Sequence, residues 1–159
     1  MNGEFEVINV NQSIMERRRI GRGLFLRLDK GEELHETIRG LSEHGISAAA
    51  LTSGIGRIRS TVIGYLDAQG VYQKVSIEEP MELVSMQGNL APGPDGPFTH
   101  IHIVASDDDH IVRGGHLFEA TVEVTAEVHM RVLGDADAPM EREATETEFL
   151  RISFCELEG

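Results

Sequence analysis

Three histidines in the second half of the sequence have the types and spacing of metal ligands. His100 and His102 lie two residues apart in the segment THIHI, and His116 follows two glycines in RGGHL. Because side chains two apart in a β-strand project from the same face, the first pair would present two imidazoles side by side. The diglycine would let the backbone turn tightly and bring the third imidazole close to that strand. The three residues therefore form a candidate site for a divalent metal ion.

Zinc is the ion that this ligand set favours. Three neutral imidazoles, with water or a substrate atom in the fourth position, are typical of zinc sites that keep an open position. Iron, nickel, cobalt or manganese could use the same ligands, because ligand softness does not separate these borderline metals. The ion could act as a Lewis acid or lower the pKa of a bound water. No general base is assigned, because the sequence does not show that Glu82 or Glu119 reaches the metal.

An ordinary interpretation of the same histidines stays open. His100 and His102 could lie on a solvated strand face and His116 could cap a turn, because isolated histidines often have such roles. The remaining histidines receive only this interpretation and are not predicted as ligands: His35, His44, His110 and His129.

Nucleophilic catalysis has little support in the sequence. Cys155 is the single cysteine, falls in a predicted strand and is interpreted as a small buried apolar residue; no G-x-S-x-G elbow occurs. The glycine-rich residues 53–57, SGIGR, could bind an anion through backbone N–H groups. A tight hairpin between two strands is the preferred explanation, because such a turn needs no ligand to account for its glycines.

The elements that must position the histidines are mostly predicted strands. Residues 22–29 alternate at period two, and Leu34, Ile38 and Leu41 then recur at helical spacing until Gly45 ends the predicted helix. Residues 91–97 are predicted as a loop, because their three prolines and two glycines do not suit a ladder. Further strands are predicted over residues 46–56, 57–67, 71–79, 81–90, 98–106, 122–132 and 148–157, with a turn at 67–70 and a polar connection at 134–146. We therefore predict an α+β fold, with a largely antiparallel sheet of about seven or eight strands flanked by one or more helices.

Composition and charge limit the class of protein. The 159 residues suit one domain, and the formal net charge of −13 would repel phosphate backbones, so nucleic acid is not the predicted partner. The sequence shows neither a signal peptide nor a membrane span, and one cysteine suits a reducing compartment. The cytoplasm is therefore the predicted location.

Several segments together resemble the plant and prokaryote conserved (PPC) domain family. The segments LDKGEELHETIRGLSEHGISAAALTSGIGRI, PMELVSMQGNL, THIH and GGHLFEATVEVTAEVHMRVL occur in that order. On this resemblance, residues 1–21 are an N-terminal segment, residues 22–133 the domain core, and residues 134–159 a loop plus a C-terminal strand that completes the same domain.

The resemblance implies an antiparallel sheet flanked by helices, and a homotrimer. In prokaryotic members, the histidine pair and the histidine of GGHL are associated with a metal ion, which corresponds here to His100, His102 and His116. The sequence thus predicts a metal-binding protein that binds or acts on a small molecule. Two alternatives stay open: a DNA-associated regulatory module, as the family's name in bacteria suggests although no AT-hook motif is present, and a metal that only joins subunits.

Overall fold

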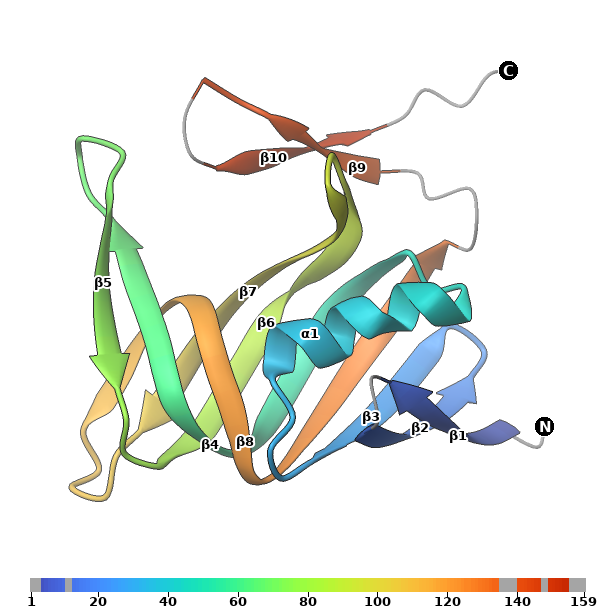
Figure 1. Cartoon of the computed structure of the whole chain (residues 1–159), viewed down its shortest axis with the longest axis horizontal. Coiled ribbons are helices and arrows are strands. Elements are labelled where there is room, and N and C mark those ends of the chain that lie inside the picture. Colours follow the sequence, from blue (N-terminus) through green and yellow to red (C-terminus); the bar gives the residue numbers. More distant parts are fainter. Residues whose placement is uncertain (1–3, 11–12, 135–139, 147–148, 155–159) are drawn as a thin grey trace.

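Antiparallel strands make up nearly all of the structure, a computed structural model that describes residues 4–10, 13–134, 140–146 and 149–154. The main sheet has eight strands in the order β1-β2-β3-β8-β7-β6-β4-β5, and a separate two-stranded sheet joins β9 and β10 (Figure 1). The elements are β1 (Glu4–Val10), β2 (Ser13–Ile20), β3 (Gly23–Asp29), α1 (Leu34–Arg39), η1 (Gly40–His44), β4 (Ala48–Leu66), β5 (Tyr72–Ile77), β6 (Met81–Gly93), β7 (Gly96–Ser106), β8 (Val112–Gly134), β9 (Met140–Ala144) and β10 (Leu150–Phe154). The predicted α+β class with an antiparallel sheet is confirmed.

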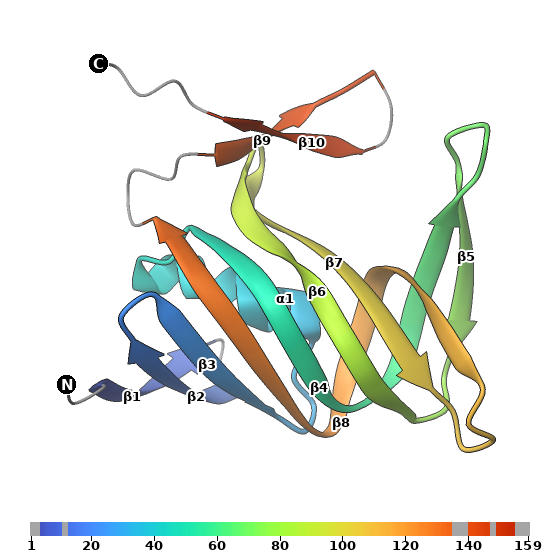
Figure 2. The ribbon, with the colours of Figure 1, turned by 180° about the vertical axis from the view of Figure 1, so that it is seen from behind.

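A closed circuit of strand pairings organises the centre of the sheet. β4 pairs with β6, β6 with β7, and β7 with the first residues of β8, which then runs on to pair with β4. Since β8 spans 23 residues, it can contact β7 near its start and β3 near its end. The long strands β4 and β8 therefore hold the two halves of the sheet together, as the view from behind shows (Figure 2).

The one α-helix of the described residues packs on one face of this sheet. Glu33 caps its first turn by accepting a hydrogen bond of 2.7 Å from the backbone N–H of Glu36. A 3-10 turn continues it to Gly45, whose left-handed conformation (φ 77°) ends the helical segment as predicted. Leu34, Ile38 and Leu41 are fully buried. The apolar stripe thus fixes which side of the helix faces the strands.

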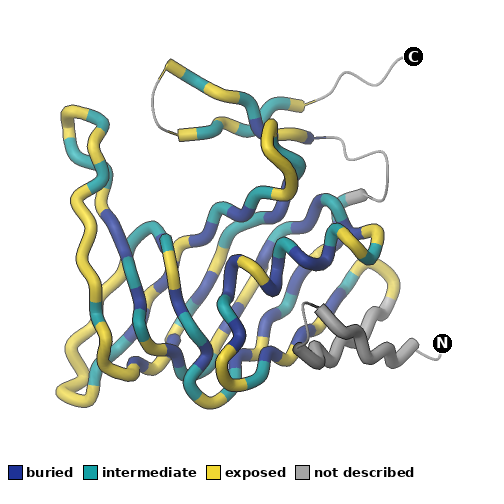
Figure 3. Tube along the Cα trace, in the orientation of Figure 1, coloured by how far each residue is buried: buried dark blue, intermediate teal, exposed yellow. Residues whose placement is uncertain are grey.

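The core lies between the helix and the strands that it covers. Leu24, Leu26 and Leu28 of β3 have no exposed surface, and Leu26 lies opposite the buried Val128 of β8. Dark blue segments in Figure 3 follow α1 and the strands beneath it. Full burial of one such aliphatic side chain stabilises the fold by about 1.5–3 kcal/mol.

No helix in the described ranges has the length and apolar character needed to cross a membrane.

The predicted hairpin at residues 53–57 is wrong, because β4 runs through it without interruption. Gly54 and Gly56 are instead positions where neighbouring strands of the sheet approach β4 closely. A Cβ at Gly56 would lie 2.3 Å from the Thr125 carbonyl oxygen, and one at Gly54 would lie 2.7 Å from the Met86 side chain. The glycines therefore allow close packing against β8 and β6 rather than a chain reversal.

The predicted loop at residues 91–97 is also wrong, because β6 and β7 extend through it as a hairpin. Pro92 lies opposite Pro97, and Gly93 opposite Gly96. Beyond Leu90, β6 pairs only with β7 among the described residues. The missing N–H groups of the prolines therefore do not interrupt hydrogen bonding to a third strand.

The predicted turn at 67–70 is confirmed, since Asp67 Oδ1 accepts hydrogen bonds from the N–H groups of Gln69 and Val71.

The C-terminal region adds a separate hairpin above the main sheet. β9 lies within the segment predicted as a polar connection, and its Met140 packs against Ala48 and Ala91. β10 falls within the predicted strand 148–157, while Cys155 lies outside the described residues. The hairpin therefore reaches the end of the molecule where β6 and β7 meet (Figure 1).

Candidate functional site

His100 and His102 project from one face of β7. Their separation by two residues places both rings on the same side, with ring centroids 5.0 Å apart. The Nε2 atoms of the two rings are 3.1 Å apart. Strand alternation alone therefore brings these two nitrogen atoms together, as the sequence predicts.

His116 reaches the same place from β8. It lies directly opposite His102 in the β7–β8 ladder, and its ring centroid is 5.0 Å from that of His100 and 5.4 Å from that of His102. One ligand atom from each of the three residues can be chosen so that all lie within 4.8 Å of one another. The structure thus gathers the three predicted residues into a single cluster.

The predicted turn at RGGHL is not observed, because Gly114 and Gly115 lie inside β8. At His116, β8 is flanked by β7 on one side and by Gly64 of β4 on the other. A Cβ at Gly115 would lie 2.7 Å from the Gly64 carbonyl oxygen. The diglycine therefore allows β8 to pack closely between β7 and β4, and this packing determines where the His116 ring lies.

Burial and nearby cations keep two of these imidazoles neutral. Burial lowers the pKa of His100 to about 4, with smaller effects from Arg142 and His102. Burial also lowers the pKa of His116 to about 4, helped by the neighbouring histidines and Lys74. Neutral imidazoles have a free lone pair, which is the form that binds a metal ion.

His35 was interpreted as an ordinary exposed helix residue, and this interpretation is wrong. The side chain is buried, its Nδ1 lies 2.7 Å from Thr99 Oγ1, and its Nε2 lies 3.1 Å from the Leu117 carbonyl oxygen. Only a protonated Nε2 can donate to that carbonyl, so Nδ1 accepts from the Thr99 hydroxyl. His35 therefore connects α1 to the residue before His100 and to the residue after His116.

The other histidines do not belong to the cluster. His129 Nδ1 lies 2.6 Å from Thr52 Oγ1, His44 ends the 3-10 turn, and His110 occupies the exposed turn between β7 and β8. They lie outside the three-histidine cluster found among the described residues.

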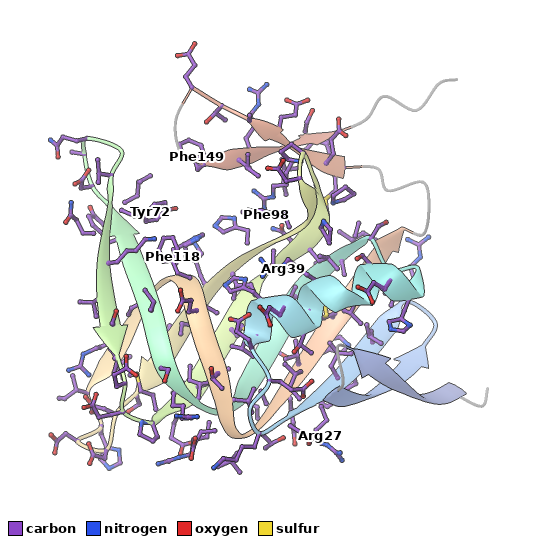
Figure 4. All side chains as sticks on the ribbon, viewed as in Figure 1. Arg27, Arg39, Tyr72, Phe98, Phe118 and Phe149 are labelled. Carbon is purple, nitrogen blue, oxygen red and sulfur yellow. The ribbon has the colours of Figure 1, made fainter. Side chains whose placement is uncertain are left out.

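A large pocket of about 810 Å³ opens beside the three rings. Aromatic side chains from different elements surround it: Tyr72 of β5, Phe118 of β8, Phe98 of β7 and Phe149 near the β9–β10 hairpin, all labelled in Figure 4. The Phe118 and Tyr72 rings form a T-shaped pair, with centroids 5.0 Å apart. The pocket therefore joins a polar histidine cluster to apolar walls, the combination typical of small-molecule sites.

Three cationic side chains also line the pocket. Arg39 comes from the last turn of α1, Lys74 from β5 and Arg142 from β9. Lys74 Nζ lies 3.7 Å above the Phe118 ring centroid, a cation–π contact. Sequence patterns did not predict this group, because its members are 35 and 68 residues apart in the chain. The one available signal was that Arg39 lies one helical turn after His35.

Arg142 is the most buried of these cations. It donates from Nη2 to Asn89 Oδ1 at 2.6 Å and from Nη1 to the Leu150 carbonyl oxygen at 2.8 Å. Its Nε is buried without a hydrogen-bond partner among the described residues, and burial lowers the pKa of the guanidinium. The bond to Asn89 ties the β9–β10 hairpin to β6 at the edge of the pocket, and the bond to Leu150 lies within the hairpin.

The three histidines suit a borderline divalent ion. In a tetrahedral zinc site with Zn–N bonds of about 2.0–2.1 Å, two nitrogen ligands lie roughly 3.3 Å apart, close to the 3.1 Å between His100 and His102. His116 Nδ1 is buried and has no hydrogen-bond partner among the described residues. Such an orphaned nitrogen is uncommon in a folded protein and would gain a partner in an ion. The ligand types and the orphaned atom therefore fit a metal.

The fold and the site define an antiparallel β-sheet protein with a histidine-lined pocket. The model of the Plants and Prokaryotes Conserved (PCC) domain matches residues 15–134, so the chain belongs to this family. A comparison with curated protein sequences found no match.

Solved structures agree with this assignment. A metal-containing protein from Archaeoglobus fulgidus is 39% identical, with 99% of both chains covered and a TM-score of 0.71. A PPC protein from Pyrococcus horikoshii is 27% identical, also with 99% of both chains covered and a TM-score of 0.74. A candidate DNA-binding protein from Bacteroides thetaiotaomicron is 20% identical, with 88% of this chain and 97% of that chain covered and a TM-score of 0.78, and shows the fold alone.

Proposed function

We propose that His100, His102 and His116 hold one divalent metal ion, with zinc the preferred ion, and that the adjoining pocket binds a small molecule beside it. The observation that carries the proposal is the convergence of three histidine nitrogens within 4.8 Å at the edge of a pocket of about 810 Å³. The relative from Archaeoglobus fulgidus, described as metal-containing, supports it. When bound, such an ion supplies a Lewis acid with a free coordination position.

The residues around the ligands would hold them in place. His35 ties Thr99 and Leu117, the immediate neighbours of two ligands, to the helix. Buried hydrogen bonds of this kind restrict the strand positions from which the ligand side chains project. The aromatic walls would exclude water from the apolar part of a bound molecule.

Elemental analysis of protein purified without added metal tests the proposal. We expect close to one ion per chain in the parent and a large loss in His102→Ala, because two imidazoles rarely retain an ion that three hold. His110→Ala is the matched control, since His110 lies in an exposed turn and should leave the metal content unchanged. Equal metal content in His102→Ala and the parent would refute the assignment.

The alternative of a DNA-associated module draws on the description of the Bacteroides relative. The net charge of −13 favours the small-molecule function, because binding to phosphate backbones depends on excess positive charge. A gel shift of duplex DNA that appears at low salt and weakens steeply as salt rises would support the alternative instead.

The homotrimer that the family resemblance implies is also part of the proposal. Val84 of β6 and Val104 of β7 are large exposed apolar residues on neighbouring strands, with Ile55 of β4 on the next strand along. Contact with another copy of the chain would remove this apolar surface from water. The trimer would then form through the outer side of these strands.

A further inference from the structure

The charges that line the pocket differ from those of the rest of the molecule. The chain has 27 acidic and 14 basic residues, yet the described residues that line the pocket include Arg39, Lys74 and Arg142 and no carboxylate. A random part of this surface would be expected to carry more acids than bases. The pocket is therefore a positively charged region in an acidic protein.

The cations of the pocket form no salt bridge within the described residues, although Arg39 lies near enough to Glu33 to act on the pKa of its carboxyl group. Within the described ranges, no carboxylate oxygen lies within 4.0 Å of the charged nitrogens of Arg39, Lys74 or Arg142, whereas several exposed basic residues elsewhere do form ion pairs. Arg142 is buried and Arg39 is half-buried, whereas Lys74 is exposed. A buried or half-buried charge without a counter-charge costs free energy unless a ligand supplies the opposite sign.

The walls of the pocket indicate what the rest of the ligand is like. Phe98 and Phe118 lie on its sides, with Tyr72 and Phe149 around them, so an anion alone would leave this apolar surface exposed to water (Figure 4). The volume of about 810 Å³ is large enough for an organic molecule with a ring or a short chain. The ligand should thus combine one anionic group with an apolar body.

The donors that the pocket offers favour a carboxylate over a phosphate. Two of the five N–H groups of Arg142 donate to Asn89 and Leu150, and its buried Nε–H has no partner among the described residues. The three cations come from separate elements, and α1 lines the pocket with the side chains of His35 and Arg39. A phosphate dianion needs more convergent donors than this, whereas a carboxylate needs few.

We propose that this pocket binds a small organic carboxylate whose apolar body lies against the aromatic walls and whose charge is balanced by Arg39, Lys74 and Arg142. The inference deepens the proposed function, on which it rests for the presence of a metal ion beside the pocket. Three neutral imidazoles would leave the charge of a bound dication uncompensated, so the ion would add to the attraction for an anion.

Binding of a matched probe series to the purified full chain by isothermal titration calorimetry tests the proposal. The probes are 4-phenylbutyrate, its neutral amide, the corresponding amine and phenyl phosphate. We expect the carboxylate to bind about tenfold or more tightly than the amide, because partly shielded charge pairs contribute on that scale, and to weaken as salt is added. Equal affinity for the amide, or tighter binding of the amine, would overturn the anion preference, and tighter binding of phenyl phosphate would overturn the carboxylate assignment.

Two pocket variants and two matched controls locate the binding site. Lys74→Gln and Arg39→Gln should each weaken carboxylate binding severalfold and leave amide binding unchanged. The controls are Lys30→Gln and Arg57→Gln, because both side chains are exposed and form ion pairs outside the pocket. Carboxylate affinities that stay at the parent value in both pocket variants would contradict the proposal.

Metal content measured on the same preparations separates this inference from the proposed function. Selective carboxylate binding to protein that holds no metal would refute the metal site and retain the anion pocket. One ion per chain without preference for the carboxylate would refute the anion pocket and retain the metal site.

Discussion

His102 lies directly opposite His116 in the β7–β8 ladder, and the centroids of the two rings are 5.4 Å apart. Cross-strand neighbours of this kind have Cβ atoms within about 5.5 Å, so their imidazoles can reach a common point without any change in the backbone. His100 joins them because it lies two residues before His102 on the same strand face. One strand pair therefore supplies the whole candidate ligand set.

Metal binding should raise the stability of the folded chain. If zinc binds only the native state, a free concentration 100 times the dissociation constant adds about 2.7 kcal/mol to the free energy of unfolding. Differential scanning calorimetry should show a lower Tm after chelation and recovery with zinc. The His116→Ala variant should show no such response while His110→Ala responds like the parent; a full zinc response in His116→Ala would argue against the site.

Gly115→Ala should weaken both the fold and metal binding. The added Cβ would lie 2.7 Å from the Gly64 carbonyl oxygen, so β8 must shift away from β4 beside His116. Overpacking of this kind costs about 1–3 kcal/mol of folding free energy. Urea unfolding and elemental analysis measure the two effects. Gly70→Ala is a useful comparison, because its Cβ would meet nothing within 4 Å although its φ of 79° adds local strain; it should therefore lose stability without losing metal.

His35 should make stability depend on pH. Burial lowers its pKa in the folded state from 6.5 to about 4, with a smaller contribution from the nearby Arg39 cation. Between these values the unfolded chain binds a proton that the folded chain does not, so the free energy of unfolding falls as pH falls. One such group changes that free energy by up to roughly 3 kcal/mol across the window.

The His35→Gln variant isolates this contribution. In the presence of a chelator, the difference in free energy of unfolding between parent and variant should be largest near pH 7 and shrink toward pH 4. Only the parent loses stability through the protonation of His35. Chemical unfolding at a series of pH values measures the difference. His110→Gln should follow the parent at every pH. Parallel pH profiles for the parent and His35→Gln would contradict the role of His35.

The chain should form a trimer in solution. Light scattering after gel filtration is expected to give three times the 17.5 kDa chain mass. Replacing both Val84 and Val104 by Glu should shift the mass toward the monomer, because charged groups at a contact between copies would be desolvated. A parent protein that runs as a monomer at all concentrations would refute the trimer, and an unchanged trimer in the double variant would place the contact elsewhere.

The sequence by itself predicted the elements whose pattern is local. The alternation of His100 and His102, the apolar spacing that ends at Gly45 and the turn at residues 67–70 all depend on residues a few positions apart. Periodicity and turn chemistry act over that range, so these features follow from the chain alone. His100 and His102 could be named for the same reason, because they share a strand face. His116 was expected to reach them through a diglycine turn, but its position depends on the pairing of β8 with β7.

Only the tertiary structure decided how distant strands lie against one another. It made Gly54 and Gly56 points of close approach inside β4, continued a hairpin through Pro92 and Pro97, and buried His35 between Thr99 and Leu117. It also brought three cations from α1, β5 and β9 to the edge of one pocket. A sequence pattern records the faces of each element but not which faces meet, because pairing between residues far apart depends on the packing of the whole sheet.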